Sequence, residues 1–166
     1  VIVSTYQSVS GGGKSSMDEL IEQTKLVLDG KKVKSKNFTK QIAFNAIPHI
    51  DLFSDDGYTK EELKMANETK KILGSDINLT ATCVRLPISV SHSESVNIKF
   101  KKSFTVDKVK DALDNFEGCK VIDKRVDGGY STPLDAEGRN ETFISRIRYD
   151  KTIENGLNLL NEHHWY

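Results

Sequence analysis

Residues 88–100 read ISVSHSESVNIKF, and two kinds of side chain alternate along this stretch. The even positions hold Ile88, Val90, His92, Glu94, Val96, Ile98 and Phe100. Every position between them holds serine, asparagine or lysine. Successive side chains of a β-strand point to opposite faces, so this period of two predicts a half-buried strand with one mostly apolar face. We expect residues 79–100 to lie in a sheet.

Shorter β-rich runs predict the other strands of this sheet. They lie at Val1–Tyr6, Lys120–Asp123 and Thr142–Tyr149. Residues 41–50 include Pro48, which has no N–H to donate to a strand ladder. We therefore expect that segment to be irregular or a short edge strand.

Helices are expected between these strands, and capping signals mark two of them. Ser16 with Glu19, and Thr59 with Glu62, have the spacing of a capping box. Another helix is expected over Val106–Phe116. Its inward-facing residues are predicted to be Val109, Ala112, Leu113 and Phe116. A glycine follows each of the three segments: Gly30, Gly74 and Gly118.

The order of these elements predicts the fold class. The chain has 166 residues, enough for one domain with its own core. Helices and strands do not follow one another as repeated βαβ units. We therefore predict an α+β fold, in which helices cover one face of a mixed or antiparallel sheet.

Composition excludes several classes of partner. The 24 basic residues balance the 24 acidic ones, so there is no basic excess of the kind that nucleic-acid binding requires. No apolar run approaches the ~20 residues that span a bilayer, and the first residues, Val1-Ile2-Val3, lack the basic region and cleavage site of a signal peptide. Cys83 and Cys119 form no CxxC or metal-ligand spacing. We expect no metal, no membrane association and a reducing, cytoplasmic location. A chain that starts within a strand also suggests a preceding segment.

The glycine-rich segment Ser8–Ser15 differs from a phosphate-binding P-loop at one position. Ser8 stands where that motif has its first glycine. The rest of the chain does not supply the βαβ units or the acidic strand end that usually accompany the motif. We expect a tight turn from strand to helix, which could also contact an anion or a cofactor.

Several charged residues allow two interpretations each. Glu61 and Lys64 are three positions apart on one helix, so they could form a surface salt bridge or grip two ends of a small zwitterion. Arg85 lies in an apolar strand, where it could form a structural ion pair or hold a carboxylate. His92 lies on the apolar face of its strand, either as a hydrogen-bonded core residue or as an acid/base group.

Longer motifs resemble one known family, the aspartate-semialdehyde dehydrogenases. The segment STYQSVSGGG at residues 4–13 is similar to the family's STYQ-x-x-SG-x-G motif. The helix EELKMANETKKIL at residues 61–73 resembles its E-E-x-K-x-x-x-ET-x-KIL motif. The pair CVR and HSE, at residues 83–85 and 92–94, keeps the family's gap. RNETFISRIR at residues 139–148 resembles a further family segment.

This resemblance implies a fold and an activity. The fold would be that of the C-terminal domain of the glyceraldehyde-3-phosphate dehydrogenase type, a domain that pairs as a homodimer. Family members reduce L-aspartyl-4-phosphate with NADPH to L-aspartate 4-semialdehyde and phosphate, in the biosynthesis of lysine, threonine and methionine. A cysteine thiolate attacks the acyl phosphate, and hydride reduces the thioester.

The same resemblance implies site residues. His92 corresponds to the acid/base histidine, and Gln7 to the residue that orients the acyl-enzyme. Glu61 would bind the substrate ammonium, Lys64 the phosphate and Arg85 the carboxylate. The loop that family members place near the nicotinamide corresponds to Ser10, Gly11 and Gly13.

The sequence also departs from the family. The catalytic Asn-Cys segment, the N-terminal NADP-binding domain and the family's C-terminal helix are absent from residues 1–166. We therefore interpret the chain as the substrate-binding and dimerisation domain, and we expect it to be inactive and to need no cofactor when alone. The alternative is a freestanding dimerisation or interaction module that has lost catalysis.

Overall fold

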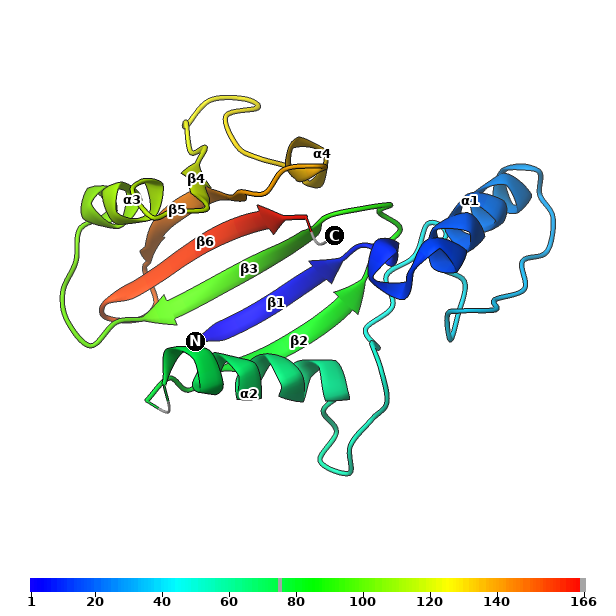
Figure 1. The fold of residues 1–166 in the computed structure, drawn as a ribbon, viewed down its shortest axis with the longest axis horizontal. Coiled ribbons are helices and arrows are strands. Elements are labelled where there is room, and N and C mark those ends of the chain that lie inside the picture. Colours follow the sequence, from blue (N-terminus) through cyan, green and yellow to red (C-terminus); the bar gives the residue numbers. More distant parts are fainter. Residues whose placement is uncertain (75, 165–166) are drawn as a thin grey trace.

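A computed structural model describes residues 1–74 and 76–164, and over this range the strands form one mixed, six-stranded sheet (Figure 1). The strands are β1 (Ile2–Gln7), β2 (Thr80–Arg85), β3 (His92–Lys99), β4 (Cys119–Val121), β5 (Thr142–Asp150) and β6 (Gly156–His163). Their order across the sheet is β2-β1-β3-β6-β5-β4. The pairs β1–β2 and β4–β5 are parallel, and the other pairs are antiparallel. The predicted α+β fold with a mixed sheet is confirmed.

The helices are η1 (Val9–Gly12), α1 (Lys14–Leu28), α2 (Lys60–Leu73), α3 (Val106–Asp114) and α4 (Pro133–Ala136). α2 and α3 cover opposite ends of the same sheet face, here called the helix face, which is the face that carries His92 and Val96. α1 lies beyond the ends of β1 and β2 (Figure 1).

Three apolar clusters hold these layers together. Under α2, Met65 packs against a cluster that includes Val3, Ala81 and Cys83. Under α3, Val109 and Leu113 pack against a second cluster from β3, β5 and β6. The third cluster lies between α1 and the loop that follows it.

The opposite face of the sheet, here called the open face, is mixed in character. It carries Ser4, Tyr6, Thr82, Ser95 and Leu160, which lie in register across four strands and are half-buried or exposed. The short helix α4 contacts β6, and burial together with its Asp135 raises the pKa of Glu162, which lies on the same face as Leu160.

The capping box predicted for α2 is confirmed. The Thr59 hydroxyl accepts from the N–H of Glu62, and the Glu62 carboxylate accepts from the N–H of Thr59 at 2.8 Å. The box predicted for α1 is wrong, because α1 begins at Lys14 after Gly13, whose side chain cannot cap.

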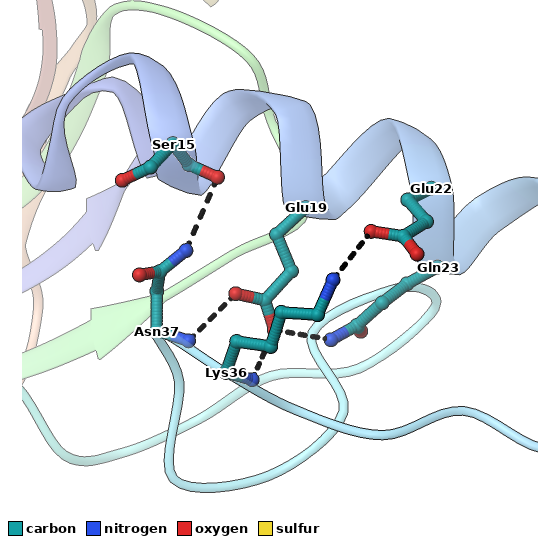
Figure 2. A network of polar contacts seen from close by, with 6 residues as sticks. All are labelled: Ser15, Glu19, Glu22, Gln23, Lys36 and Asn37. Carbon is teal, nitrogen blue, oxygen red and sulfur yellow. Dashed lines mark hydrogen bonds and ion pairs between the residues drawn. The ribbon is translucent and has the colours of Figure 1, made fainter.

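Glu19 of α1 instead holds the loop that follows the helix. Its carboxylate accepts from the backbone N–H groups of Lys36 and Asn37 and from the Gln23 amide (Figure 2). Gln23 in turn accepts from the N–H of Ile42 at 2.8 Å. Both side chains are almost fully buried, so these bonds fix the loop against α1.

Two further predictions about apolar residues differ from the structure. Ala112 and Phe116 are exposed, because α3 ends at Asp114 and turns its apolar side toward β5 through Val109 and Leu113. The strand predicted from residue 88 begins only at His92, because Ser91 has a φ of 66° and interrupts the extended backbone. No helix among the described residues is long and apolar enough to cross a membrane.

Candidate functional site

A cavity of about 840 Å³ opens on the helix face beside α2. Its walls include seven of the residues predicted for the site: Gln7, Ser10, Gly11, Glu61, Lys64, Arg85 and His92. They come from β1, η1, α2, β2 and β3, which are far apart in the sequence. Gly13 is not in these walls; it is the N-cap residue of α1, and a Cβ there would meet nothing within 4 Å.

Gln7 at the end of β1 is held in one orientation. Its side-chain oxygen accepts from the Thr5 hydroxyl at 3.1 Å, and its Nε2 donates to Glu61 at 3.3 Å. Thr5 and Gln7 share the helix face because they are two residues apart on one strand. The amide donor of Gln7 therefore points toward α2 and the cavity.

Glu61 and Lys64 form the ion pair of the first interpretation, and they also line the cavity. Their charged atoms lie 3.7 Å apart, so they do form an ion pair. The pair also lines the cavity, with the Glu61 side chain 22% exposed and that of Lys64 55% exposed. An exposed pair of this kind adds little stability, and its charges stay available to a ligand.

Glu62 fixes the position of this pair, a role that the sequence did not reveal. While one oxygen caps α2, the other accepts from the backbone N–H of Cys83 at 3.0 Å. α2 is therefore tied to β2 one residue away from Glu61. The signal was visible only as a capping box, which carries no information about a second acceptor.

Arg85 lies at the end of β2 and is largely buried. Its Nη1 donates to the backbone oxygen of Ser8 at 2.6 Å. Burial lowers the pKa of Arg85, and the carboxylate of Glu61 opposes that shift. None of the ion pairs found among the described residues includes Arg85, so its charge is available to a carboxylate in the cavity.

His92 at the start of β3 is uncharged at neutral pH. Burial, followed by the charges of His163 and Arg85, lowers its pKa to about 4. Its Nδ1 lies 3.0 Å from the Ser8 hydroxyl, and its ring centroid lies 5.8 Å from that of His163. A neutral imidazole at a cavity wall can accept a proton, as an acid/base group must.

Gly11 permits the close approach of the Arg85 and His92 side chains. A Cβ at Gly11 would lie 3.0 Å from Arg85 Nη1 and 3.5 Å from His92 Nε2. Any larger residue would press on the guanidinium. The glycine-rich turn therefore forms part of the cavity wall, and its Lys14 pairs with Asp18 in solvent.

The described residues that line the cavity include no cysteine thiol, and they form no metal site. Burial raises the pKa of the Cys83 thiol to about 11, and its sulfur packs 3.6 Å from that of Met65. Cys119 lies on β4 against the cluster under α3, away from the cavity. No group of three or more metal-ligating side chains is found in the described ranges.

Comparison with known proteins gives a consistent result. The family described as "semialdehyde dehydrogenase, dimerisation domain" matches residues 1–163. The aspartate-semialdehyde dehydrogenase of Aquifex aeolicus is 47% identical over 161 residues, which are 96% of this chain and 47% of that protein. The chain thus spans about half the length of such relatives.

Solved structures agree in fold. A Vibrio cholerae aspartate semialdehyde dehydrogenase II, solved in complex with ASA, is 39% identical and has a TM-score of 0.93 over 98% of this chain and 48% of that one. A Candida albicans aspartate semialdehyde dehydrogenase solved with NADP is 21% identical and has a TM-score of 0.67 over 98% of this chain and 44% of that one. At that identity the likeness concerns the fold alone.

Proposed function

Since the chain belongs to the semialdehyde dehydrogenase family, as its dimerisation domain, we propose that it forms the substrate-binding half of an aspartate-semialdehyde dehydrogenase. The whole enzyme would reduce L-aspartyl-4-phosphate to L-aspartate 4-semialdehyde and phosphate with NADPH. The observation that carries the proposal is the convergence of Gln7, Glu61, Lys64, Arg85 and His92 on one cavity.

Three charges of the cavity match the charges of this substrate. Arg85 binds the α-carboxylate, because a planar guanidinium can donate two parallel bonds to it. Glu61 binds the α-ammonium group, and Lys64 binds the phosphate. The ion pair between Glu61 and Lys64 opens as each charge meets its counterpart on the substrate.

His92 and Gln7 act at the reacting carbonyl. A neutral His92 accepts the proton of the attacking thiol and later returns a proton to the product. Gln7, held by Thr5, donates to the acyl group and keeps it aligned. The thiol belongs to the remaining half of the family protein, since Cys83 is buried under α2.

The cofactor site is shared with that other half. Ser10 and Gly11 line the cavity without bulky side chains, which leaves room for a flat nicotinamide ring. NADPH supplies the hydride when it is bound. Gly13 would contribute only through the turn. Because the chain offers one wall of this site, we expect the chain alone to bind no NADP tightly and to have no turnover. Its two free thiols fit a reducing cytoplasm.

The open face is our candidate for the homodimer contact. Tyr6 and Leu160 supply apolar area at its centre, and Ser4, Thr82 and Ser95 supply groups that can bond across an interface. This surface is therefore mixed in character rather than uniformly apolar. Dimer interfaces combine both kinds of surface.

Ligand titration of the chain itself tests the proposed function. Inorganic phosphate and L-aspartate, each at millimolar concentration, should shift the amide NMR signals of α2, β2 and the turn at residues 8–11. Lys64→Ala should weaken phosphate binding at least threefold, whereas Lys71→Ala, an exposed lysine of the same helix outside the cavity, should not. If neither ligand shifts these signals, the freestanding dimerisation module becomes the better account.

A further inference from the structure

Ser8 connects two functional residues of the cavity from beneath. Its backbone oxygen accepts from Arg85 Nη1 at 2.6 Å, and its hydroxyl lies 3.0 Å from Nδ1 of His92. The residue itself is fully buried and lies behind the cavity wall rather than in it. It touches no ligand space, so any effect on chemistry must pass through its neighbours.

The hydroxyl of Ser8 is not used for the purpose that its position in the chain suggests. Ser8 is the N-cap residue of η1, where a serine usually accepts from a backbone N–H of the first turn. Here it makes no such bond. Its hydroxyl faces His92 and the Ser10 hydroxyl instead, the latter at 2.9 Å. The Ser8 side chain therefore contacts the His92 imidazole instead of capping the helix.

The segment that carries Ser8 is fixed on both sides. The N–H of Val9 donates to Ile88 at 2.9 Å, and the N–H of Leu86 donates to Gln7 at 2.9 Å. Since the backbone on both sides of Ser8 is held by hydrogen bonds, the Ser8 hydroxyl oxygen has a fixed position beside the His92 ring.

The surroundings of the ring select one of two tautomers. His92 Nε2 and Arg85 Nη1 both lie within 3.5 Å of the place where a Gly11 Cβ would be. A positive charge beside Nε2 favours a lone pair there over an N–H group. The ring proton then belongs on Nδ1, which points at Ser8.

We propose that Ser8 is a positioning residue: its oxygen accepts a hydrogen bond from Nδ1–H of His92, so that Nε2 keeps its lone pair toward the cavity. The Ser8 hydroxyl then donates to Ser10, which completes the chain of bonds. A base at Nε2 is the form that could take a proton from a thiol in the cavity. This inference rests on the proposed acid/base role of His92.

Nitrogen-15 NMR of the histidine rings in the ligand-free chain tests it directly. At neutral pH, Nε2 of His92 should show the shift of an unprotonated nitrogen, and Nδ1 that of a protonated one. The opposite pattern in the wild-type chain would overturn the proposal without the need for any variant.

Variants then assign the cause. Ser8→Ala should move His92 toward the Nε2–H tautomer, whereas Ser8→Thr, which keeps an oxygen opposite Nδ1, should retain most of the wild-type pattern. Ring signals of His49 serve as the internal control for folding. A Ser8→Ala chain that is folded but has an unchanged His92 pattern would exclude the positioning role.

Phosphate binding separates this inference from the proposed function. Ser8→Ala keeps the backbone oxygen that holds Arg85, so phosphate affinity should change by less than about twofold. Loss of the tautomer pattern with unchanged binding supports both proposals. A wild-type chain with the expected tautomer but no phosphate or aspartate binding would remove the proposed function and leave the Ser8–His92 bond established.

Discussion

Glu62 accepts a hydrogen bond from the backbone N–H of Cys83 at 3.0 Å, and this bond joins the start of α2 to the middle of β2. The same carboxylate completes the cap of α2 through Thr59. One side chain thus decides both where the helix begins and where it lies on the sheet.

Replacing Glu62 should therefore lower the stability of the protein. Glu62→Ala removes a cap and leaves a strand N–H without its acceptor, so the free energy of unfolding should fall by about 1–3 kcal/mol. Urea denaturation measures this change. Lys71→Ala is the matched control and should stay within about 0.5 kcal/mol of wild type. An equal loss of stability in both variants would show that the hydrogen bond between Glu62 and Cys83 does not stabilise the protein more than an exposed side chain does.

Glu162 on β6 should make the protein less stable as the pH rises. It is buried and accepts from the Ser93 hydroxyl, and burial raises its pKa from 4.5 to about 7, with a smaller contribution from Asp135. A raised folded-state pKa means that the folded protein holds the proton more tightly. The contribution is present below pH 4.5 and is lost as the pH rises through about 7.

Glu162→Gln, which stays neutral, should remove this dependence and raise the stability at pH 8 by up to about 3 kcal/mol, at 1.36 kcal/mol per pKa unit. Urea denaturation of both proteins between pH 4 and 8 measures the difference. Curves that stay parallel across that range would contradict the assignment.

His92 should act in the opposite direction. Its pKa falls from 6.5 to about 4 in the folded protein, so the unfolded chain takes up a proton first as the pH falls. Stability is therefore lost between pH 6.5 and about 4. His92→Gln should flatten this limb of the stability curve, most clearly in a Glu162→Gln background where the opposing carboxyl is neutral. If the double variant still loses stability between pH 6.5 and about 4, another titrating group causes that loss.

Gly11→Ala should impair the cavity without unfolding the chain. The added methyl group would lie 3.0 Å from Arg85 Nη1, so the guanidinium must move by a few tenths of an ångström. Affinity for L-aspartate should fall at least threefold in an NMR titration. Gly13→Ala is the contrasting variant: a φ of 79° with a ψ of −177° is a conformation essentially restricted to glycine, so alanine should be strained by about 1–3 kcal/mol, but nothing lies within 4 Å of the added methyl group. It should lower stability and leave binding intact.

A charge on the open face should separate the homodimer. Ser95 lies in register with Leu160 near the centre of that face, and Ser95→Arg places an unpaired cation there. Sedimentation at micromolar concentration should detect dimers for the wild type and monomers for the variant. Lys108→Glu, on the outer surface of α3, should remain dimeric. A dimer that tolerates Ser95→Arg would move the interface elsewhere.

Local patterns in the sequence predicted much of the fold. The Thr59–Glu62 spacing located α2, and the alternation through Val96 located β3 and its two faces. The pattern failed where backbone conformation overrides it, as at Ser91 with its positive φ. It also missed β6, because Gly156–His163 mixes polar and apolar residues on both faces and gains its order only by pairing with β3 and β5.

The candidate site was also predictable only in part. The resemblance to the family supplied Gln7, Glu61, Lys64, Arg85 and His92, and the structure places all five in the walls of one cavity. The supporting contacts of these residues were not predictable. They depend on tertiary placement, as when a serine at a helix start turns its hydroxyl toward a ring 84 positions later.

The buried carboxylate of Glu19 has a consequence for local unfolding of the protein. Glu19 bonds to Lys36 and Asn37, and α1 has its own apolar cluster apart from those under α2 and α3. We therefore expect α1 and the loop that follows it to unfold as a separate cooperative unit, a foldon. Its amide protons would exchange with solvent together in one opening event, at lower free energy than those of β1 and β3. The turn at Ser8–Gly11 joins this foldon to the sheet, so the cavity wall lies at the boundary between a rigid unit and one that opens more readily.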